Sequence, residues 1–169
     1  QRINEILEFV ELTDRADDKS RRYSGGMKRR LMIGMALLHK PKMLFLDEPT
    51  VGLDPQVRRK MWDLIRKMNE AGMTVLLTTH YIEEADQLCR RVAIMNRGRI
   101  IAVDTPQKLK EKVGRVVVEH MEADGMINNF FDNREQAASY VAGLNSNATV
   151  REANLEDVFI ELTGRRVND

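Results

Sequence analysis

Hydrophobic residues recur along the chain with both helical and strand-like spacing, which predicts an alternation of the two kinds of element. Near the N-terminus, spacings of three and four residues predict an amphipathic helix. The residues on its apolar face are Ile3, Ile6, Leu7 and Val10. The polar stretch 13–22 predicts a loop. A second helix is expected from Met27 until Pro41 stops it, with an apolar face made of Leu31, Met35 and Leu38.

Two short β-rich runs with a helix between them predict a parallel sheet. The run Met43–Leu46 is apolar at every position, as expected of a parallel strand that is buried on both faces. Asp54 followed by Pro55 predicts the start of a helix that Gly72 closes, with an apolar stripe of Val57, Met61, Leu64, Ile65 and Met68. The second β-rich run is Met73–Thr79. This strand, helix, strand order predicts an α/β fold with a right-handed crossover.

The rest of the chain predicts smaller helices and strands. A helix is expected over 82–90, then a hairpin that turns at Arg97-Gly98, and then a short helix that Thr105-Pro106 caps. Beyond Gly114 we expect a strand at 116–120, a polar region around 124–134, a helix near 135–143, a strand near 149 and a last helix over 154–162.

Composition narrows the classes of function. The 27 Lys and Arg residues balance 26 Asp and Glu residues, so the net charge of +1 gives no global field for nucleic acid, and no nucleic-acid partner is expected. The apolar runs are far shorter than the ~20 residues of a membrane-spanning helix. The single cysteine, Cys89, excludes an internal disulfide framework and favours the cytoplasm. Because residue 1 is Gln rather than Met, a fragment of a larger protein is expected.

Two adjacent acids stand where the first predicted strand ends. Asp47 and Glu48 follow four apolar residues. Consecutive side chains on a strand point apart, so Asp47 can reach a Mg²⁺ shell through water while Glu48 faces an attacking water as base or orienting group. This is the Walker B pattern of phosphoryl-transfer enzymes. An isolated acid pair is equally consistent with two solvated side chains at a turn.

Ser24, Gly25 and Gly26 open the helix that contains Met27. Two residues without a Cβ let backbone amides and the Ser24 hydroxyl approach an anion at the positive end of the helix, where a γ-phosphate would fit. Residues 28–30 are all basic and add local positive charge. The same tripeptide is also common as a simple turn before a helix, and basic side chains on a helix are commonly solvated.

His80 stands at the end of the second predicted strand. After Thr78 and Thr79, its ring could contact a γ-phosphate or hold Glu48 and a water in line. A lone histidine at a strand end is commonly structural. With a neighbouring glutamate at helical spacing it could also form half of a metal site, but no third ligand is apparent, so a metal held in this way is discounted.

These motifs occur in a specific order, and together they indicate a family. The segments are RYSGGMKRRL at Arg22–Leu31, MLFLDEPTVGLDP at Met43–Pro55 and VLLTTHYIEEAD at Val75–Asp86. In this order the chain resembles the ABC-type ATPases, in particular the subunits of drug- and polysaccharide-exporting systems. The resemblance covers about residues 1–113, and the tail segment LEDVFIELTG shows a weaker similarity.

The resemblance implies a P-loop NTPase-like α/β fold, with a parallel sheet and helices, that is incomplete in its N-terminal half. Residues 1–42 would be part of the helical signature subdomain and residues 43–113 the C-terminal half of the ATPase core. Residues 114–169 would be a small α/β accessory element.

The resemblance also implies roles for individual residues. The segment from Ser24 to Met27 would be the signature loop, which grips the γ-phosphate of ATP held by an opposite subunit. Asp47 would be the Mg²⁺ aspartate and Glu48 the catalytic glutamate.

Two further residues match family motifs and two depart from them. By the resemblance, Asp54 would lie in the D-loop that joins the two sites of a dimer, and His80 would be the switch histidine. Tyr23 replaces the usual leucine and Met27 the usual glutamine; both departures are mild, since the serine and the backbone make the phosphate contacts.

The loop that cradles the β-phosphate is missing from the sequence. No Gly-x-x-x-x-Gly-Lys-Ser/Thr run occurs in the 169 residues, so the chain alone is expected to be inactive. In this family the strand before that loop lies between the strand ending at His80 and the strand at Val92. Its removal is expected to leave unpaired edges, which an N-terminal half or a strand from another chain would fill.

The first hypothesis is therefore the ATPase subunit of an ABC exporter. It would bind ATP and Mg²⁺, dimerise with a second ATPase subunit, and act at the inner face of the cell membrane through a transmembrane permease. The alternative is a non-enzymatic half-module that dimerises with or regulates a complete ATPase. A cassette ATPase acting on DNA or ribosomes is a third interpretation, which the short lead before Ser24 and the Val51-Gly52 pair disfavour.

Overall fold

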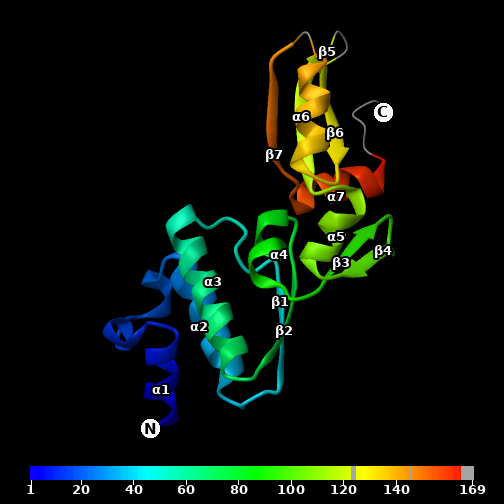
Figure 1. Ribbon diagram of the computed structural model, residues 1–169. Helices are drawn as coiled ribbons and strands as arrows, with labels where there is room; N and C mark the ends of the chain where they lie inside the picture. The colour runs from blue at the N-terminus through cyan, green and yellow to red at the C-terminus, as the bar shows by residue number, and fades with distance from the viewer. Residues whose placement is uncertain (123–124, 145, 165–169) are drawn as a thin grey trace. The chain divides into compact units, whose positions relative to one another are not determined.

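The computed structural model describes residues 1–122, 125–144 and 146–164, which fall into two compact units, 1–80 and 81–169 (Figure 1). Each unit mixes helices with strands, in agreement with the predicted α/β class. The three-part division at residues 42 and 113 stays a prediction. Within the described ranges, no helix is both long enough and apolar enough to cross a membrane.

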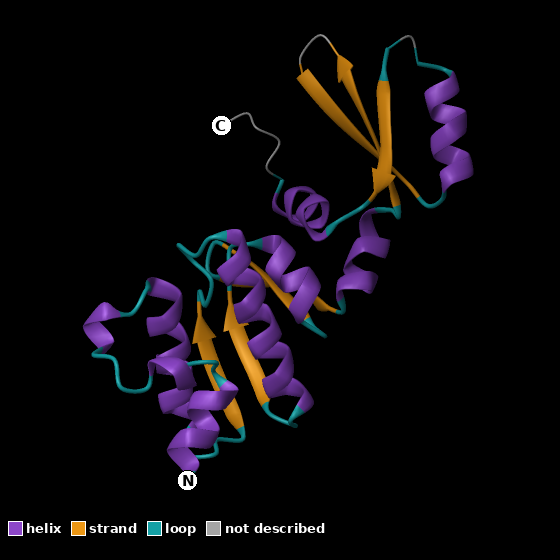
Figure 2. Cartoon of the chain, turned by 90° about the vertical axis from the view of Figure 1, so that its left-hand side faces the viewer, coloured by secondary structure: helices purple, strands orange, loops and turns teal. Residues whose placement is uncertain are grey.

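Unit 1 contains a two-stranded parallel sheet with helices. Its helical elements are α1 (Arg2–Phe9), the short 3-10 helices η1 (Thr13–Arg15) and η2 (Ser20–Arg22), α2 (Gly25–Leu37) and α3 (Pro55–Glu70). Its strands are β1 (Met43–Asp47) and β2 (Thr74–Thr78), which pair in register from Met43 with Thr74 to Asp47 with Thr78. Figure 2 shows the two strands as neighbouring arrows that point the same way. The predicted parallel pairing is confirmed.

The buried face of α2 differs from the predicted one. Met35 and Leu38 are exposed, and the buried residues are Gly26, Ile33, Gly34 and Leu37. A Cβ on Gly34 would lie 3.1 Å from Ile6 Cγ2, so α1 packs directly onto the α2 backbone. The hydrophobic pattern gave the wrong face because a glycine marks a helix contact without contributing an apolar side chain.

Tyr23 replaces the leucine that is usual in the motif that this segment resembles, and a specific contact accounts for it. Its ring is buried, and its hydroxyl donates a hydrogen bond of 2.6 Å to the carbonyl of Arg15. The bond spans the segment that the sequence predicts as a loop and that contains η1 and η2. A leucine would fill the same apolar space but could not donate this bond, so the tyrosine holds the segment before α2 in place.

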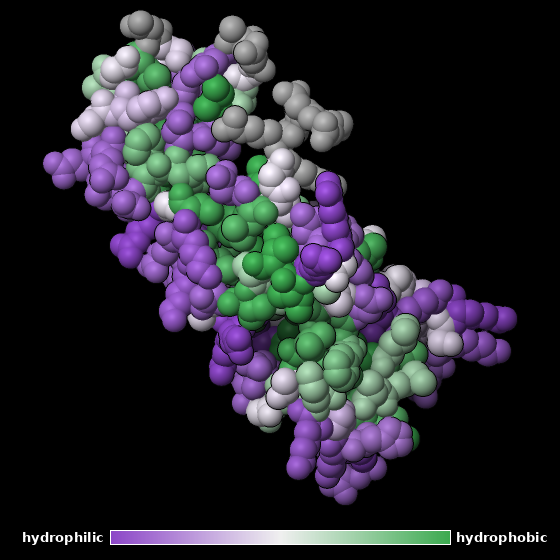
Figure 3. Space-filling view, turned by 90° about the vertical axis from the view of Figure 1, so that its right-hand side faces the viewer, coloured by the Kyte–Doolittle hydropathy of each residue, from purple (hydrophilic) through white to green (hydrophobic). Residues whose placement is uncertain are grey.

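The sheet of unit 1 is uncovered on one face. Leu44 is buried, whereas Met43, Phe45 and Leu76 are 39%, 69% and 46% exposed. The expectation that this apolar strand is buried on both faces is therefore wrong for this chain. In Figure 1, α2 and α3 lie on the same side of β1 and β2, and Figure 3 shows hydrophobic side chains at the surface. Among the described residues β2 pairs with β1 alone, which leaves its other edge without a strand.

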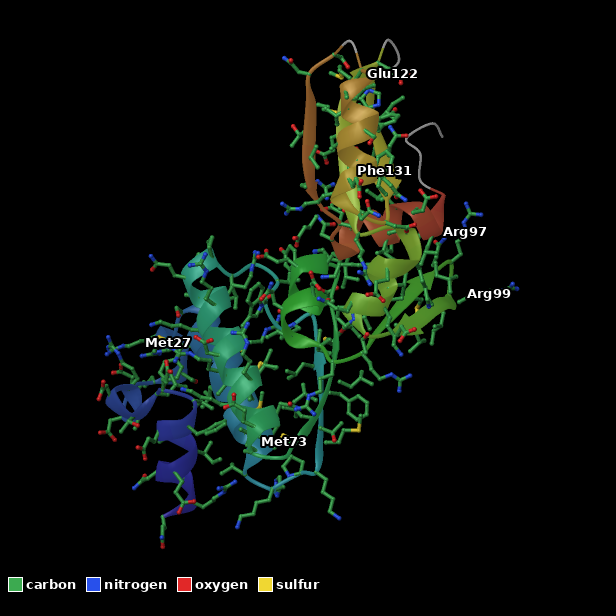
Figure 4. The ribbon with its side chains drawn as sticks, viewed as in Figure 1. Met27, Met73, Arg97, Arg99, Glu122 and Phe131 are labelled. Atoms are coloured by element: carbon green, nitrogen blue, oxygen red, sulfur yellow. The ribbon has the colours of Figure 1, made fainter. Side chains whose placement is uncertain are left out.

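Unit 2 begins with a helix and a hairpin. Its first elements are α4 (Ile82–Leu88), β3 (Val92–Asn96), β4 (Arg99–Asp104) and α5 (Pro106–Val113). Strands β3 and β4 are antiparallel, and Arg97 and Gly98 turn between them with positive φ angles of 48° and 74° (Figure 4). This agrees with the predicted hairpin. The core under it contains Ile94, Leu109, Leu155 and Val158.

A three-stranded antiparallel sheet follows, in the order β6-β5-β7. Its elements are β5 (Val116–Glu122), β6 (Gly125–Phe131), α6 (Arg134–Ala142) and β7 (Ala148–Glu152), and α7 (Leu155–Thr163) ends the described chain. The polar region predicted around 124–134 is instead mostly strand β6, while Asp124 itself lies outside the described residues. The Asn129 amide donates 3.0–3.1 Å bonds to His120 Nε2 and to the Tyr140 hydroxyl. A polar residue is thus accommodated inside the sheet, which its sequence could not indicate.

A partly buried ion pair joins β7 to α7. The Arg151 guanidinium donates two 2.7 Å bonds to Asp157, whose side chain is 3% exposed, and a 2.8 Å bond to Glu119. Hydrogen bonds to Asp157 and then Glu119 hold the pKa of Arg151 above its ordinary value, against the opposing effect of burial. Asp157 also accepts from the backbone of Asn154 and completes the capping box of α7. One carboxylate therefore fixes both the helix start and the strand before it.

Replacing Asp157 by Asn should destabilise unit 2 by about 2 kcal/mol or more, because it leaves Arg151 without its main partner. This is below the ~3–5 kcal/mol of a fully buried pair, since Arg151 keeps Glu119 and is 30% exposed. Native-state hydrogen exchange of the amides of Val116–Val118 would measure the loss. Glu156→Gln, at an exposed acid on the same helical turn, is the control. Equal exchange rates in D157N and wild type would contradict the assignment.

Candidate functional site

The ends of β1 and β2 bring the predicted hydrolytic residues to one edge of the sheet. Because the strands are parallel and in register, Asp47 lies opposite Thr78. The Thr78 hydroxyl donates a hydrogen bond to Asp47 Oδ1. The carboxylate of Asp47 is thus oriented by the neighbouring strand.

Glu48 lies beyond the strand in a left-handed backbone conformation. Its φ is 46°. The prediction that strand alternation sets the direction of the Glu48 side chain is therefore wrong. Such a conformation costs about 1–3 kcal/mol for a residue with a side chain. Its N–H donates to the Thr78 carbonyl at 3.0 Å, and its carbonyl accepts from the Arg29 guanidinium at 2.8 Å. Hydrogen bonds on both sides of the residue offset the strain.

His80 contacts the side chain of Glu48. The ring atom Nδ1 lies 3.0 Å from the Glu48 carboxylate, with the His80 side chain 62% and the Glu48 side chain 35% exposed. Both carboxylate oxygens of Glu48 lie 3.0 Å from this nitrogen, and Oε2 is buried. A carboxylate held by one histidine keeps lone pairs that can accept a hydrogen bond from one more group, such as a water.

At the start of α2, the backbone of Gly25 faces open space, whereas the backbone of Gly26 is packed against a neighbouring helix. The Ser24 hydroxyl accepts a 3.3 Å bond from the Met27 amide and caps the helix; Met27 is labelled in Figure 4. A Cβ on Gly25 would meet no atom within 4 Å, whereas a Cβ on Gly26 would lie 2.4 Å from Val57 Cγ1. Gly25 therefore leaves room for an anion. Gly26 serves the packing of α2 against α3.

Asp54 caps α3 in the way that its sequence predicts. Its carboxylate accepts from the amides of Gln56 at 3.0 Å and Val57 at 2.9 Å. Through Val57, the start of α3 touches the start of α2, so the predicted D-loop and signature loop are packed together. The structure accounts for Asp54 locally, and its role across a dimer stays a prediction.

Two residues at the site were missed by the sequence analysis. Thr78 was treated only as a neighbour of His80, and Arg29 only as part of a basic run. One signal was available for the arginine: cations are unfavourable near the positive end of a helix, so basic residues in that position need specific partners. Arg29 binds the Glu48 carbonyl, and Arg30 donates to the carbonyls of Val10 and Glu11.

The carboxylates at this edge fit a magnesium ion that takes most of its ligands from elsewhere. Within the described ranges, no group of three or more His, Cys, Asp or Glu side chains is placed to hold a metal. Mg²⁺ in nucleotide sites is commonly bound by phosphate oxygens, several waters and one or two protein carboxylates. Asp47, exposed and held by Thr78, matches that limited contribution.

Comparison with known proteins gives consistent matches. The family model described as ABC transporter matches residues 1–51. The linearmycin resistance ATP-binding protein LnrL of Bacillus subtilis (strain 168) is 37% identical over an alignment that covers 100% of this chain and 65% of that protein. The Nod factor export ATP-binding protein I of Cupriavidus metallidurans is 39% identical, with 100% and 63% covered. The chain spans less than two thirds of the length of these relatives.

Solved structures agree with the sequence matches. An ATP-binding cassette of an ABC transporter in its ADP conformation has a TM-score of 0.60 and 29% identity, covering 63% of this chain and 42% of that chain. An ATP-binding subunit of an ABC transporter has a TM-score of 0.60 and 25% identity, covering 96% of this chain and 53% of that chain. The fold class predicted from the sequence is confirmed by these structures.

The two glycines of the candidate signature loop should respond differently to alanine. Gly26→Ala should lower the stability of unit 1 by about 1–3 kcal/mol, since its methyl group overlaps Val57. Gly25→Ala, which meets open space, should change stability by less than about 1 kcal/mol. Urea unfolding followed by the fluorescence of Trp62, the single tryptophan, measures both. The double variant G26A/V57A should regain stability over G26A; failure to do so would contradict the packing assignment.

Proposed function

We propose that this chain, which belongs to the ABC transporter ATP-binding family, supplies the hydrolytic carboxylate, the switch histidine and the signature loop of a transport ATPase. The observation that carries the proposal is the 3.0 Å contact between His80 and Glu48 beside Asp47. Acid, histidine and metal-side carboxylate meet at the ends of two adjacent parallel strands. An in-line attack of water on a phosphoryl group uses a group that orients the water and a metal ion that neutralises charge, and these residues can serve both needs.

Each residue has a separate task in this proposal. Glu48 orients a water through the remaining lone pairs of its carboxylate and accepts a proton from it. His80 holds the Glu48 side chain, and Thr78 holds Asp47, which would bind the metal, through water, when it is present. When bound, ATP provides the electrophilic γ-phosphoryl group and Mg²⁺ neutralises its charge.

The signature loop acts on the opposite subunit. The start of α2 offers the Ser24 hydroxyl, the open backbone at Gly25 and the positive end of a 13-residue helix. These are the features of an anion site at a helix N-terminus. In a dimer this loop would contact the γ-phosphate that the second ATPase subunit binds, and Asp54 would help to join the two sites.

The phosphate-cradling loop must come from another polypeptide segment. It does not occur in the 169 residues, and the free edge of β2 and the exposed Phe45 offer a place where a segment that carries it can complete the sheet. The complete ATPase would be cytoplasmic and would act at the membrane through a transmembrane permease. Export is favoured because the names of the two relatives refer to resistance and to Nod factor export.

Hydrolysis should require both this chain and a polypeptide with an intact phosphate loop. We expect no Mg·ATP binding by this chain alone in calorimetry, and binding with phosphate release once the second polypeptide is added. Glu48→Gln should retain binding but lower the hydrolysis rate by about 100-fold or more, as for the loss of a general base. Glu70→Gln, at an exposed acid of α3, is the matched control.

The possible outcomes separate the hypotheses. Binding by this chain alone would contradict the requirement for the second segment. Binding and release that do not depend on Glu48 would contradict its role. If neither this chain alone nor its mixture with the second polypeptide binds or hydrolyses ATP, the result would favour a non-enzymatic half-module that dimerises with or regulates a complete ATPase.

A further inference from the structure

Glu48 occupies a backbone conformation that its own sequence does not favour. Among the described residues, a positive φ occurs at four that are not glycine: Glu11, Lys40, Glu48 and Arg97. Glu11 and Lys40 follow the ends of α1 and α2, and Arg97 lies in a hairpin turn. Glu48 instead follows a strand and carries the carboxylate of the candidate site. In this conformation its side chain lies 3.0 Å from His80 Nδ1.

Two different elements hold the peptide groups of Glu48. On the amide side, β2 accepts through the Thr78 carbonyl at 3.0 Å, and the Thr78 hydroxyl lies 3.3 Å away. On the carbonyl side, the Arg29 guanidinium donates at 2.8 Å and the Val51 amide at 3.3 Å. The arginine bond is the shorter of the two and comes from 19 residues away in the sequence. Without it, the carbonyl keeps only the longer bond within its own turn.

Arg29 projects from the helix that begins with the candidate signature loop. Helix α2 is fixed at several points: Gly26 packs against Val57 of α3, and Arg30 donates to the last carbonyls of the α1 segment. Arg29 follows Gly25 by four residues, about one turn of this helix. A displacement at Gly25 therefore reaches Glu48 through a single side chain.

We propose that Arg29 is a positioning residue: it locks the left-handed backbone of Glu48 and links the position of the signature helix to that of the hydrolytic carboxylate. This inference rests on the proposed function. Arg29 touches no reacting group and acts only through Glu48. Contact of an opposite nucleotide with the start of α2 would then orient Glu48 in the same subunit, so that hydrolysis follows the closing of the dimer.

The test uses the two-polypeptide hydrolysis assay with three variants. Arg29→Ala should lower kcat for ATP by about 10-fold or more with KM unchanged, because binding groups are untouched while Glu48 loses its position. Arg29→Lys, which keeps one donor, should recover part of kcat. Arg59→Ala removes the same side chain from an exposed position on α3 and should leave kcat unchanged.

A readout on this chain alone keeps the inference separate from the proposed function. In NMR spectra the carbonyl and Cα carbon shifts of Glu48 report its backbone conformation. R29A should move them and accelerate exchange of the Glu48 amide, whereas R59A should not. Trp62 fluorescence in urea checks that unit 1 remains folded. If R29A does not fold, Arg29→Gln, which retains a neutral donor, takes its place in both measurements.

Three results would overturn the inference. Unchanged Glu48 shifts in R29A would show that Arg29 does not hold this backbone. Moved shifts with an unchanged kcat, or a fall in kcat/KM caused by KM alone, would show that the bond is structural only. If the wild-type mixture hydrolyses no ATP, the proposed function fails and the catalytic part of the inference with it, while the shifts still decide whether Arg29 fixes Glu48.

Discussion

The in-register pairing of β1 with β2 is the constraint on which the candidate site depends. Parallel strands end at the same edge of a sheet, and this register sets Asp47 against Thr78. The residues just beyond, Glu48 and His80, can then meet at 3.0 Å. A shift of the register by one residue would turn the strand's side chains to the opposite face and separate the acid from the histidine.

Different interactions hold the elements of the two units together. Unit 1 brings helix backbones close to neighbouring side chains at Gly26, where a Cβ would overlap Val57, and at Gly34, where a Cβ would lie only 3.1 Å from Ile6. Unit 2 fixes its elements with a charged pair, Arg151 and Asp157, whose hydrogen bonds satisfy a helix cap and a strand together. Close packing gives precise helix positions near the site, while the ion pair specifies a single arrangement of β7 and α7.

Sequence reasoning succeeded where an element depends on its own residues. The cap at Asp54 uses only the two amides of Gln56 and Val57, so its motif is sufficient to predict it. It failed where contacts come from elsewhere. The apolar residues of β1 could not reveal that Phe45 is 69% exposed. The two asparagines of β6 gave no sign of a strand in which the Asn129 amide finds partners on β5 and α6.

The same distinction applies to the site. The motifs were sufficient to predict that Glu48 and His80 lie close together, because they follow strands of a predicted parallel sheet. The Arg29 contact spans 19 residues and depends on the angle between α2 and β1, which no local pattern records. The left-handed φ of Glu48 was also beyond the sequence, since glutamate has no preference for it.

The uncovered sheet face also affects how this protein can be engineered. Surface redesign usually exchanges the most exposed apolar residues, and Phe45, at 69%, would be among the first chosen. A charged residue there would improve solubility, but it would also block the proposed completion of the sheet. Solvent exposure in a chain of this kind therefore does not identify residues that can be changed freely. Substitutions intended to improve solubility are safer on the exposed face of α3, away from the strands.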